Sequence, residues 1–536
     1  MEEEVIDGKG IIPDGATEIV AYEFMGCTSL QSIVIPASVT VIGHNAFIGC
    51  TSLQSIEIPD SVTWIGWSAF KGCTSLLSIV IPDGVTEIGE ETFMGCTSLQ
   101  SIVIPDSVTV IGSHAFIGCT SLQSIEIPDS VTQISALAFS GCTSLQSIAI
   151  PDSVTMIVGD VFEGCNNLTS IIVSKNNSKY KSANNCILSK DGEELISCQN
   201  HSIPEGIKNI GDYAFYGCTS LESIAIPDSV TTIGERAFDG CTSLKSIIIP
   251  DSVTKIGRGA FDGCTSLRSI VIPDGVTEIE KAAFVCCSYL QSVEIPNSVT
   301  KIGESAFMEC TTLQSIRIPD SVTTIGERAF DCTSLRSIVI PDGVTEIKNG
   351  AFQHCSCLQS IDIPDSVTKI GESTFYGCTS LQSIKIPDSV TKIGNFAFYD
   401  CTSLQSIKIP DSVTKIGDLA FYGCTSLQSI KIPNSVTEIG REAFKGCTSI
   451  QSIVIPDSAR NGGIAFSGCT SLKSITITTQ EKEPDQSHRW IEYLLEPLSE
   501  YSKEFSLRVP IGCGYAYRHY PAFEDKFKTI IADIDA

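Results

Sequence analysis

The sequence predicts a repeat solenoid, in which short coils stack along one axis and each coil contributes one parallel β-strand. Near-copies of one 23-residue unit, such as the unit from Gly377 to Tyr399, recur along the chain to about residue 478. Leucine and isoleucine stand at fixed places in every copy, and a period in the twenties is typical of solenoids. A single unit is too small to be stable alone, so neighbouring units must stack.

Within the unit, the residue types predict the order of the local elements. Leu381, Ile384 and Ile386 can face the core while the residues between them face water, which is the pattern of a strand. Pro387 lacks the amide hydrogen that a ladder bond needs, so it ends the strand. An Asp-Ser turn follows, and Gly394 allows a further bend before an Ala-Phe pair returns to the core.

The positions at which the repeats begin and end divide the chain into three segments. Residues 1–26 hold a partial first coil that serves as a minimal N-terminal cap, and residues 27–478 form the solenoid. The coil at 166–207 is enlarged, and the Lys-Asp-Gly sequence around Asp191 predicts a β-hairpin that projects from the stack. Residues 479–536 are rich in Tyr and Phe, so we expect them to form a small C-terminal cap over the last apolar face.

Most of the 24 cysteines stand at one repeat position. A single thiol at a fixed phase of each coil behaves as a small buried hydrophobe. Parallel side-chain directions disfavour disulfides between neighbouring coils, so we expect free thiols and, from them, a reducing compartment. This predicted ladder comprises Cys27, Cys50, Cys73, Cys96, Cys119, Cys142, Cys165, Cys218, Cys241, Cys264, Cys287, Cys310, Cys332, Cys355, Cys378, Cys401, Cys424, Cys447 and Cys469.

The charge balance excludes several classes of partner. The chain has 35 Lys and Arg against 62 Asp and Glu, a formal net charge of −27. Such a chain repels nucleic acid and anionic membrane surfaces. No apolar run approaches the roughly 18 residues of a membrane span, and the acidic N-terminus lacks the basic and apolar segments of a secretory signal. These features predict a cytoplasmic monomer without an anchor.

The motif CxxLxxIxIPxxVxxIGxxAFxG resembles the BspA-like, treponemal class of leucine-rich repeats over about nine tenths of the chain. The enlarged coil, with NNSKYKS, CILSKDGEELISC and SIPEGIKNIGDYAF, is similar to an insertion of that family. The ending LRVPIGCGYAYRHYPAFEDKFKTII resembles the family's terminal pattern, although Phe stands where Trp is usual. The resemblance implies a right-handed leucine-rich solenoid for adhesion or protein binding, without a shared catalytic motif. It also implies a secreted or surface-attached protein, whereas the N-terminal residues do not resemble an export signal.

One outward strand position changes character along the chain. Neighbouring coils lie about 4.8 Å apart, so Lys385, Lys408 and Lys431 should form a basic row. We interpret the strand face as binding a protein partner through an apolar N-terminal zone and a cationic C-terminal zone that prefers carboxylate-rich surfaces. The alternative is that recent duplication alone made neighbouring copies alike. The position reads Val34, Glu57, Val80, Val103, Glu126, Ala149, Ile172, Ala225, Ile248, Val271, Glu294, Arg317, Val339, Asp362, Lys385, Lys408, Lys431, Val454 and Thr476.

A second row of lysines stands one residue before the Ile-Gly step, nearby in sequence. Neither row resembles a catalytic arrangement, and no nucleophile, phosphate-binding or dinucleotide motif is present. We therefore predict no catalytic residue and no cofactor. The candidate partner-binding residues are Arg317, Lys385, Lys408, Lys431, Lys369, Lys392 and Lys415.

Metal ligands are also not predicted. An aspartate follows the strand proline in most copies, as at Asp388, but turn chemistry accounts for it as well as calcium does. The six histidines show no paired zinc spacing. The residues that come nearest to a ligand cluster are His354, Cys355 and Cys357, together with Cys286 and Cys287. The repeat alone explains Cys287 and Cys355.

The sequence thus favours a non-catalytic binding scaffold or adhesin. Two alternatives remain. Thr and Ser after nearly every repeat cysteine suggest a passive protein with an ordered surface, and an enzyme would need its site in the cap at 479–536.

Overall fold

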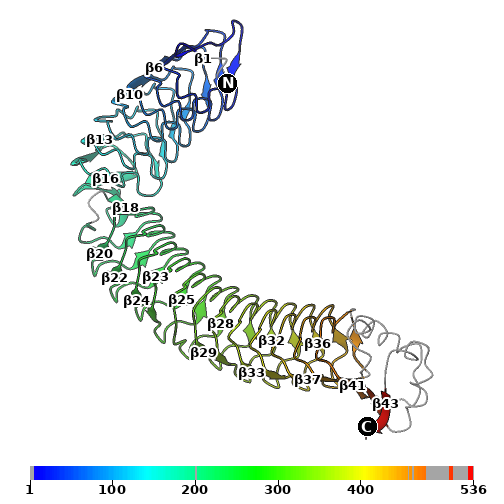
Figure 1. The fold of residues 1–536 in the computed structure, drawn as a ribbon. Coiled ribbons are helices and arrows are strands. Elements are labelled where there is room, and N and C mark those ends of the chain that lie inside the picture. Colours follow the sequence, from blue (N-terminus) through cyan, green and yellow to red (C-terminus); the bar gives the residue numbers. More distant parts are fainter. Residues whose placement is uncertain are drawn as a thin grey trace. The chain divides into compact units, whose positions relative to one another are not determined.

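The computed structural model describes residues 5–198, 202–456, 458–461, 464–478, 506–510 and 529–534. These residues form a parallel β-solenoid with turns of about 23 residues, and none of them lies in a helix. The chain divides into two compact units, Met1–Cys264 and Thr265–Ala536, each of which is described by itself. Both are built from the same stacked turns (Figure 1).

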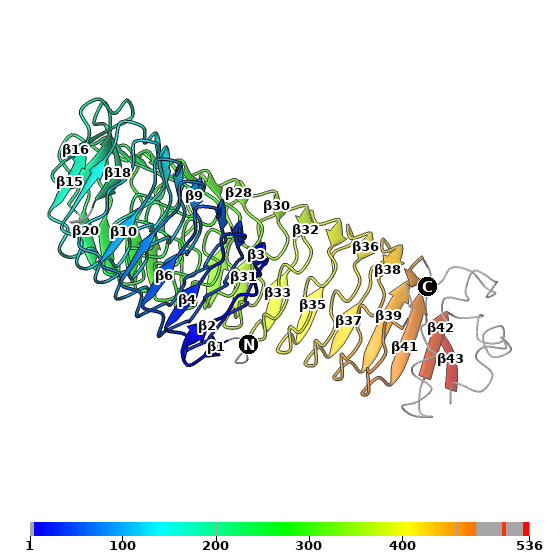
Figure 2. The ribbon, with the colours of Figure 1, turned by 90° about the horizontal axis from the view of Figure 1, so that it is seen from above.

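Each turn carries two short strands, of which sequence analysis predicted the first. The first is a Ser-Ile-X segment such as β33 (Ser383–Lys385), and the second is an X-Ile segment such as β34 (Lys392–Ile393). Side chains alternate between the core and solvent along each strand. Ile384 and Ile393 are therefore buried, whereas the adjacent Lys385 and Lys392 are exposed. In unit 2, the first and second strands lie along different sides of the stack (Figures 1 and 2).

The strands of the two units occupy equivalent places in successive turns. In Met1–Cys264 the first strands are β4 (Ser32–Val34), β6 (Ser55–Glu57), β8 (Ser78–Val80), β10 (Ser101–Val103), β13 (Ser147–Ile150), β15 (Ser170–Val173), β20 (Ser223–Ala225) and β22 (Ser246–Ile248). The second strands are β3 (Glu18–Ile19), β5 (Val41–Ile42), β7 (Trp64–Ile65), β9 (Glu87–Ile88), β11 (Val110–Ile111), β12 (Gln133–Ile134), β14 (Met156–Ile157), β19 (Asn209–Ile210), β21 (Thr232–Ile233) and β23 (Lys255–Ile256).

In Thr265–Ala536 the first strands are β24 (Ser269–Val271), β26 (Ser292–Glu294), β29 (Ser337–Val339), β31 (Ser360–Asp362), β33, β35 (Ser406–Lys408), β37 (Ser429–Lys431), β39 (Ser452–Pro456) and β41 (Ser474–Thr478). The second strands are β25 (Glu278–Ile279), β27 (Lys301–Ile302), β28 (Thr324–Ile325), β30 (Glu346–Ile347), β32 (Lys369–Ile370), β34, β36 (Lys415–Ile416), β38 (Glu438–Ile439) and β40 (Arg460–Asn461). Residues 124–126 and 315–317 occupy first-strand positions but are irregular.

The core consists of columns of identical side chains. One buried Phe per turn stacks on the Phe of the next turn, as Phe116 does on Phe93 and Phe139 with ring centroids 5.5 Å apart on both sides. All of the predicted ladder thiols except Cys332 are buried, and most of them donate a hydrogen bond to the carbonyl oxygen of a Phe in the preceding turn. The Cys142 Sγ, for example, lies 3.2 Å from the Phe116 oxygen. These columns hold consecutive turns at one register.

The enlarged coil joins the sheet of unit 1. β16 (Tyr180–Ala183), β17 (Cys186–Ser189) and β18 (Glu194–Cys198) pair antiparallel in that order, with the turn after Ser189 joining β17 to β18. β18 then pairs in parallel with β19, with Leu195 opposite Ile210. The insertion is therefore built into the stack through β18, and does not simply project from it as the sequence predicted.

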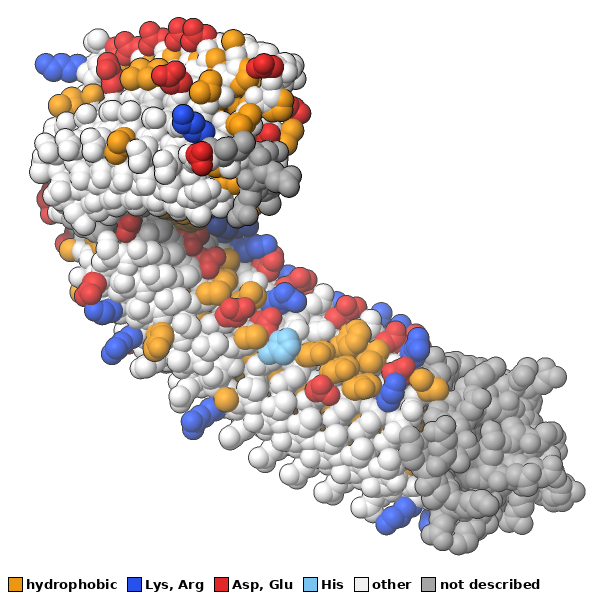
Figure 3. All heavy atoms as spheres, turned by 45° about the horizontal axis from the view of Figure 1, so that its top comes forward, with side chains coloured by type: hydrophobic (Ala, Val, Ile, Leu, Met, Phe, Trp, Pro, Cys, Tyr) orange, Lys and Arg blue, Asp and Glu red, His pale blue; other side chains and the backbone are white. Residues whose placement is uncertain are grey.

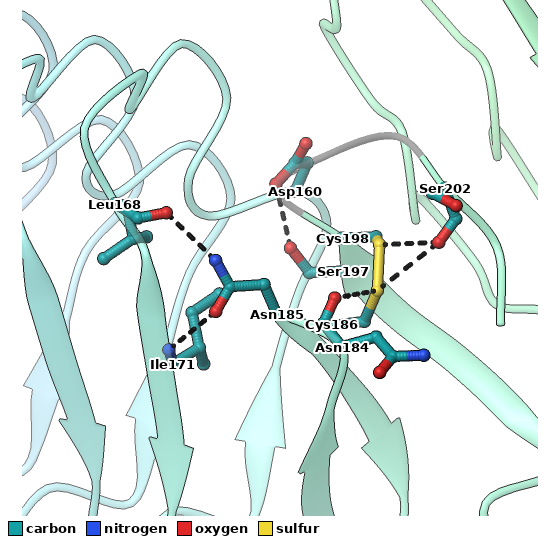
Figure 4. The surroundings of a disulfide bond; sticks show 9 residues. All are labelled: Asp160, Leu168, Ile171, Asn184, Asn185, Cys186, Ser197, Cys198 and Ser202. Atoms are coloured by element: carbon teal, nitrogen blue, oxygen red, sulfur yellow. Dashed lines mark hydrogen bonds between the residues drawn. A yellow bond between two sulfur atoms is a disulfide. The ribbon is translucent and has the colours of Figure 1, made fainter.

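A disulfide between Cys186 and Cys198 links β17 to β18 (Figure 4). The neighbouring Asn185 ties the insertion to the turn before it, because its side chain accepts a hydrogen bond from the Ile171 amide and donates one to the Leu168 carbonyl. Sequence analysis did not predict this disulfide. The available signal was that both cysteines lie outside the ladder and on facing strands of a hairpin.

The described ends continue the same sheets. β1 (Val5–Ile6) pairs antiparallel with β2 (Lys9–Gly10), which pairs in parallel with β4. At the other end, β42 (Ser506–Pro510) pairs with β41, and β43 (Thr529–Ile534) pairs with β42. Most of the predicted C-terminal cap at 479–536 lies outside the described residues. In the part of the chain that the structure describes, no helix has the length and apolar character needed to cross a membrane.

Candidate interaction surface

The first lysine row lies on the first strands of unit 2. Lys385 and Lys408 are direct register partners, and Lys431 occupies the same position in the next turn. All three side chains are exposed because the flanking isoleucines take the core-facing positions. None of the three forms an ion pair with another described residue. The row therefore presents three unneutralised ammonium groups on an otherwise acidic protein.

The second lysine row lies on the second strands, where Lys369, Lys392 and Lys415 are consecutive register partners. Its two ends are neutralised by glutamates of the adjoining turns. The Nζ atom of Lys369 lies 2.7 Å from Glu346 Oε1, and that of Lys415 lies 2.8 Å from Glu438 Oε1. The hydrogen bond and charge of Glu438 raise the pKa of Lys415.

The second row also lines a shallow pocket of about 380 Å³. Polar side chains of the adjoining turns, including Asn349, Glu372 and Asn395, complete its lining. Figure 3 shows lysine and arginine interspersed with aspartate and glutamate along one face of this unit. The pocket is thus a mixed-charge depression, in which an incoming anion would meet the Glu372 carboxylate as well as the three lysines.

The seven predicted residues do not form one surface. The two lysine rows belong to the two strand series, which lie along different sides of the stack (Figure 2). Arg317 is exposed but stands in the irregular segment 315–317, and Glu294 and Val339 take its position in the adjoining turns. It is therefore separated from both rows.

The outward row of unit 1 is apolar and acidic, as the sequence order implied. Val34 is 81% exposed, and Val80 and Val103 are 62% and 57% exposed. Glu57 stands between Val34 and Val80 in the stack. Ile248 near the end of this unit is 82% exposed. Several large apolar side chains along this row of unit 1 therefore remain exposed to solvent.

The thiol ladder offers no nucleophile. Burial raises the pKa of Cys50, Cys96 and Cys142 to about 12, so these thiols carry their protons at neutral pH. Their hydrogen bonds to Phe carbonyls also require the protonated form. The ladder is a packing device rather than a reactive site.

Cys332 is not part of the ladder, contrary to the sequence prediction. The turn is one residue short, and Thr333 fills the buried slot, where its hydroxyl donates to the Phe330 carbonyl oxygen at 2.9 Å. Cys332 moves to the preceding position and is only partly buried. Burial, together with the neighbouring Asp331, raises the pKa of Cys332 to about 11.

The structure also rearranges the cluster around His354. Cys355 is a buried ladder thiol that donates to the Phe330 carbonyl, and Cys357 is exposed. The groups that approach His354 are Asp331 and Cys332, neither of which the sequence analysis had grouped with it. The signal that would have found them is the one-residue deletion, which shifts both residues relative to the repeat.

Comparisons with known proteins agree with this architecture. The family model of the BspA type leucine rich repeat region matches residues 9–116, 86–190, 193–290, 277–404 and 391–487. No curated protein matches the chain.

Several solved structures similar to this chain are bacterial leucine-rich repeat proteins. A leucine rich cell surface protein from Faecalibacterium prausnitzii is 39% identical, with 56% of this chain and 82% of that chain covered and a TM-score of 0.42. A leucine-rich repeat protein from Bacteroides ovatus is 26% identical, with 95% and 96% covered and a TM-score of 0.36. The leucine rich repeat protein of T. pallidum is 31% identical, with 36% and 86% covered and a TM-score of 0.26. The chain belongs to the BspA-type leucine-rich repeat family.

Proposed function

We propose that the protein is a non-catalytic scaffold that binds another protein through the first-strand side of its solenoid, at a cell surface. The row of Lys385, Lys408 and Lys431 carries this proposal, because three exposed lysines without ion-pair partners stand in register on a chain of net charge −27. Parallel lysines repel one another, and a carboxylate-rich partner surface relieves that repulsion. The surface location rests on the description of the similar Faecalibacterium protein.

The second lysine row supplies a matched control for this proposal. It contains the same number of lysines in the same unit, but Glu346 and Glu438 already neutralise its ends. Reversing either row to glutamate changes the net charge of the chain by the same amount. Any effect of total charge is therefore shared by the two variants, and a difference between them reports position.

The test is to crosslink the full-length protein to its partner in the native organism, identify that partner, and measure its affinity for each variant. The Lys385→Glu, Lys408→Glu, Lys431→Glu variant should bind about tenfold or more weakly, with a smaller salt dependence. The Lys369→Glu, Lys392→Glu, Lys415→Glu variant should bind as the unmodified protein does. Unchanged affinity in the first variant would reject the cationic contact.

The alternative hypothesis, a passive protein with an ordered surface, was based on the threonines that follow the ladder cysteines in the sequence. In the structure these hydroxyls donate to the preceding turn, as Thr97 does to the Thr74 carbonyl at 3.3 Å. The threonine row thus contributes to the stacking of turns, and its recurrence is explained without a surface function.

A further inference from the structure

One repeat position, directly before the ladder cysteine, requires a left-handed backbone. In most turns it is glycine, as at Gly377 and Gly423, both with φ of 70°. Glycine lacks the Cβ atom that makes this conformation unfavourable for other residues by about 1 kcal/mol or more. A side chain at this position therefore carries a cost in every turn that contains one.

Four consecutive turns of unit 2 depart from glycine at this position. Their residues are Cys286, Glu309, Cys332 and His354, with φ values of 56°, 61°, 58° and 55°. All four carry side chains of the types that bind transition metals. The substitutions gather in one stretch of the array, at and around the turn from which a residue has been deleted.

The deletion brings together three potential ligands from two turns. Asp331 Oδ1 lies 3.2 Å from His354 Nδ1, and single ligand atoms of Asp331, Cys332 and His354 all lie within 4.8 Å of one another. The Asp331 side chain is only 8% exposed, whereas that of His354 is 45% exposed. The cluster thus has a buried carboxylate at its base and an imidazole that solvent can reach.

We propose that Asp331, Cys332 and His354 form a binding site for a divalent transition metal of the Zn²⁺ class. Zn²⁺ accepts thiolate, imidazole and carboxylate ligands, and this set contains one of each. Tetrahedral bonds of about 2.0 to 2.3 Å separate ligand atoms by about 3.3 to 3.8 Å. Closing the cluster around an ion therefore requires ligand atoms to approach one another by up to about 1.5 Å, which side-chain rotation supplies.

Metal binding replaces a thiol proton and a hydrogen bond by bonds to the ion. The Cys332 thiol releases its proton to solvent as the sulfur–metal bond forms. The proton that His354 Nδ1 shares with Asp331 moves to Nε2 by exchange with solvent, so that Nδ1 and the carboxylate can each bond to the ion. Arg328 Nε, 3.9 Å from Asp331 Oδ2, remains on the outer side of the carboxylate. Three protein ligands leave one coordination position open to water. The bound ion links two consecutive turns at the place where the repeat is irregular.

Room for His354 comes from the next turn, which has reverted to glycine. A Cβ atom at Gly377 would lie 3.2 Å from His354 Cδ2, closer than most such contacts. The glycine therefore leaves space for the imidazole to turn toward Asp331 and Cys332. Two turns after His354, Asp400 occupies the same left-handed position with φ of 53°, outside this group of ligands.

The experiment uses full-length protein without an affinity tag, treated with chelator and then titrated with Zn²⁺ by calorimetry and with Co²⁺ by visible absorption. We expect one strongly bound ion per chain, a thiolate-to-cobalt band, and proton release on binding. Cys332→Gly and His354→Gly each restore the residue that other turns carry, so both variants should fold. Each should remove the cobalt band and weaken Zn²⁺ binding about tenfold or more.

Asp400→Gly is the matched control, since it restores glycine at the same repeat position and leaves all three ligands in place. It should bind Zn²⁺ and Co²⁺ as the unmodified protein does, with circular dichroism confirming the fold of every variant. The proposal is overturned if the unmodified chain binds no ion. It is also overturned if binding survives in either ligand variant, or if Asp400→Gly loses it equally.

Discussion

Asp239 and Asp262 occupy the same repeat position in consecutive turns. The surroundings of the Asp239 carboxyl group oppose its ionisation. Burial, followed by the charge of Asp262, raises the pKa of Asp239 to about 6, although Arg236 Nη1 lies 3.2 Å from its carboxylate. The folded state thus holds this proton more tightly than an unfolded chain, in which an aspartate titrates near 3.9. Ionising Asp239 therefore lowers stability as the pH rises from about 4 to about 6.

Replacing Asp239 by asparagine removes this penalty. We expect Asp239→Asn to be about 1 kcal/mol more stable than the unmodified protein at pH 7, since the side chain is partly solvated and the arginine pair is lost. The difference should vanish near pH 4. Urea unfolding at the two pH values measures it. Asp251→Asn is the control, because other copies carry asparagine in that exposed turn, as at Asn297. A variant no more stable at pH 7 contradicts the assignment.

Cys332 shows where residue-level prediction ended. Periodicity alone placed Cys332 in the ladder. The turn is one residue short, and the repeat pattern fits equally well whether the missing residue is placed before or after the cysteine. Packing decides between them, since Thr333 can fill the buried slot and satisfy its hydroxyl with the Phe330 carbonyl. The contacts of Asp331 and Cys332 with His354 depend on that choice, so the sequence grouped the wrong cysteines with His354.

At the scale of elements, the phenylalanine column joins each turn to the next. Rings in neighbouring turns are nearly parallel, with interplanar angles of 11° and 4° on the two sides of Phe116. A ring inside the column, such as Phe116, is covered on both faces by its neighbours. A truncation therefore opens a cavity shared by three turns, which the fixed register of the strands prevents from closing.

Phe116→Ala should destabilise unit 1 by about 3 to 5 kcal/mol. Chemical denaturation gives the loss, and hydrogen exchange shows whether it is concentrated in the turns of Phe93, Phe116 and Phe139. Phe116→Leu, which keeps most of the apolar volume, should cost clearly less. An alanine variant within about 1 kcal/mol of the unmodified protein would show that the stack is not a principal source of stability.

The sequence predicted the first strand of each turn but not the second. The first contains alternating buried and exposed residues around a central isoleucine, whereas a two-residue strand such as β34 is too short to show alternation. Its pairing arises only because the stack places identical segments side by side. In the insertion, the turn near Asp191 was readable from its residues, but the pairing of β18 with β19 depends on tertiary packing.

For the whole molecule, the repeat explains why Cys357 differs so much in accessibility from the other cysteines that the structure describes. The ladder thiols are enclosed by turns on both sides, whereas Cys357 is exposed, and Cys286 and Cys332 are partly buried. Alkylation requires a thiolate that the reagent can reach, and burial raises the pKa of ladder thiols such as Cys355 to about 12.

Brief treatment of the native protein with iodoacetamide should therefore modify Cys357 and spare the described ladder cysteines. Peptide mass spectrometry before and after unfolding in guanidinium measures both groups in one sample. Cys357→Ser should remove the dominant native product among these thiols. Modification of ladder cysteines at a rate similar to Cys357 would mean that the turns open readily.

Periodicity predicted the stack, its register and the two lysine rows, because each depends on the repeat and on strand spacing. It did not predict that the rows lie on different sides, since that depends on how the chain bends after Pro387. It also could not show that Lys369 and Lys415 are neutralised while Lys385 is not. Those differences depend on which glutamates the adjoining turns contribute.

The recurring side-chain hydrogen bonds have a direction. Cys50 donates to Phe24, Ser61 to Val39 and Thr63 to Thr40, each from one turn to the turn before it. A duplicated unit therefore arrives with donors that match acceptors already present on its neighbour, and it offers the same acceptors to the unit after it. Such an array can lengthen by copying one segment of its gene, without evolving a new interface at each addition.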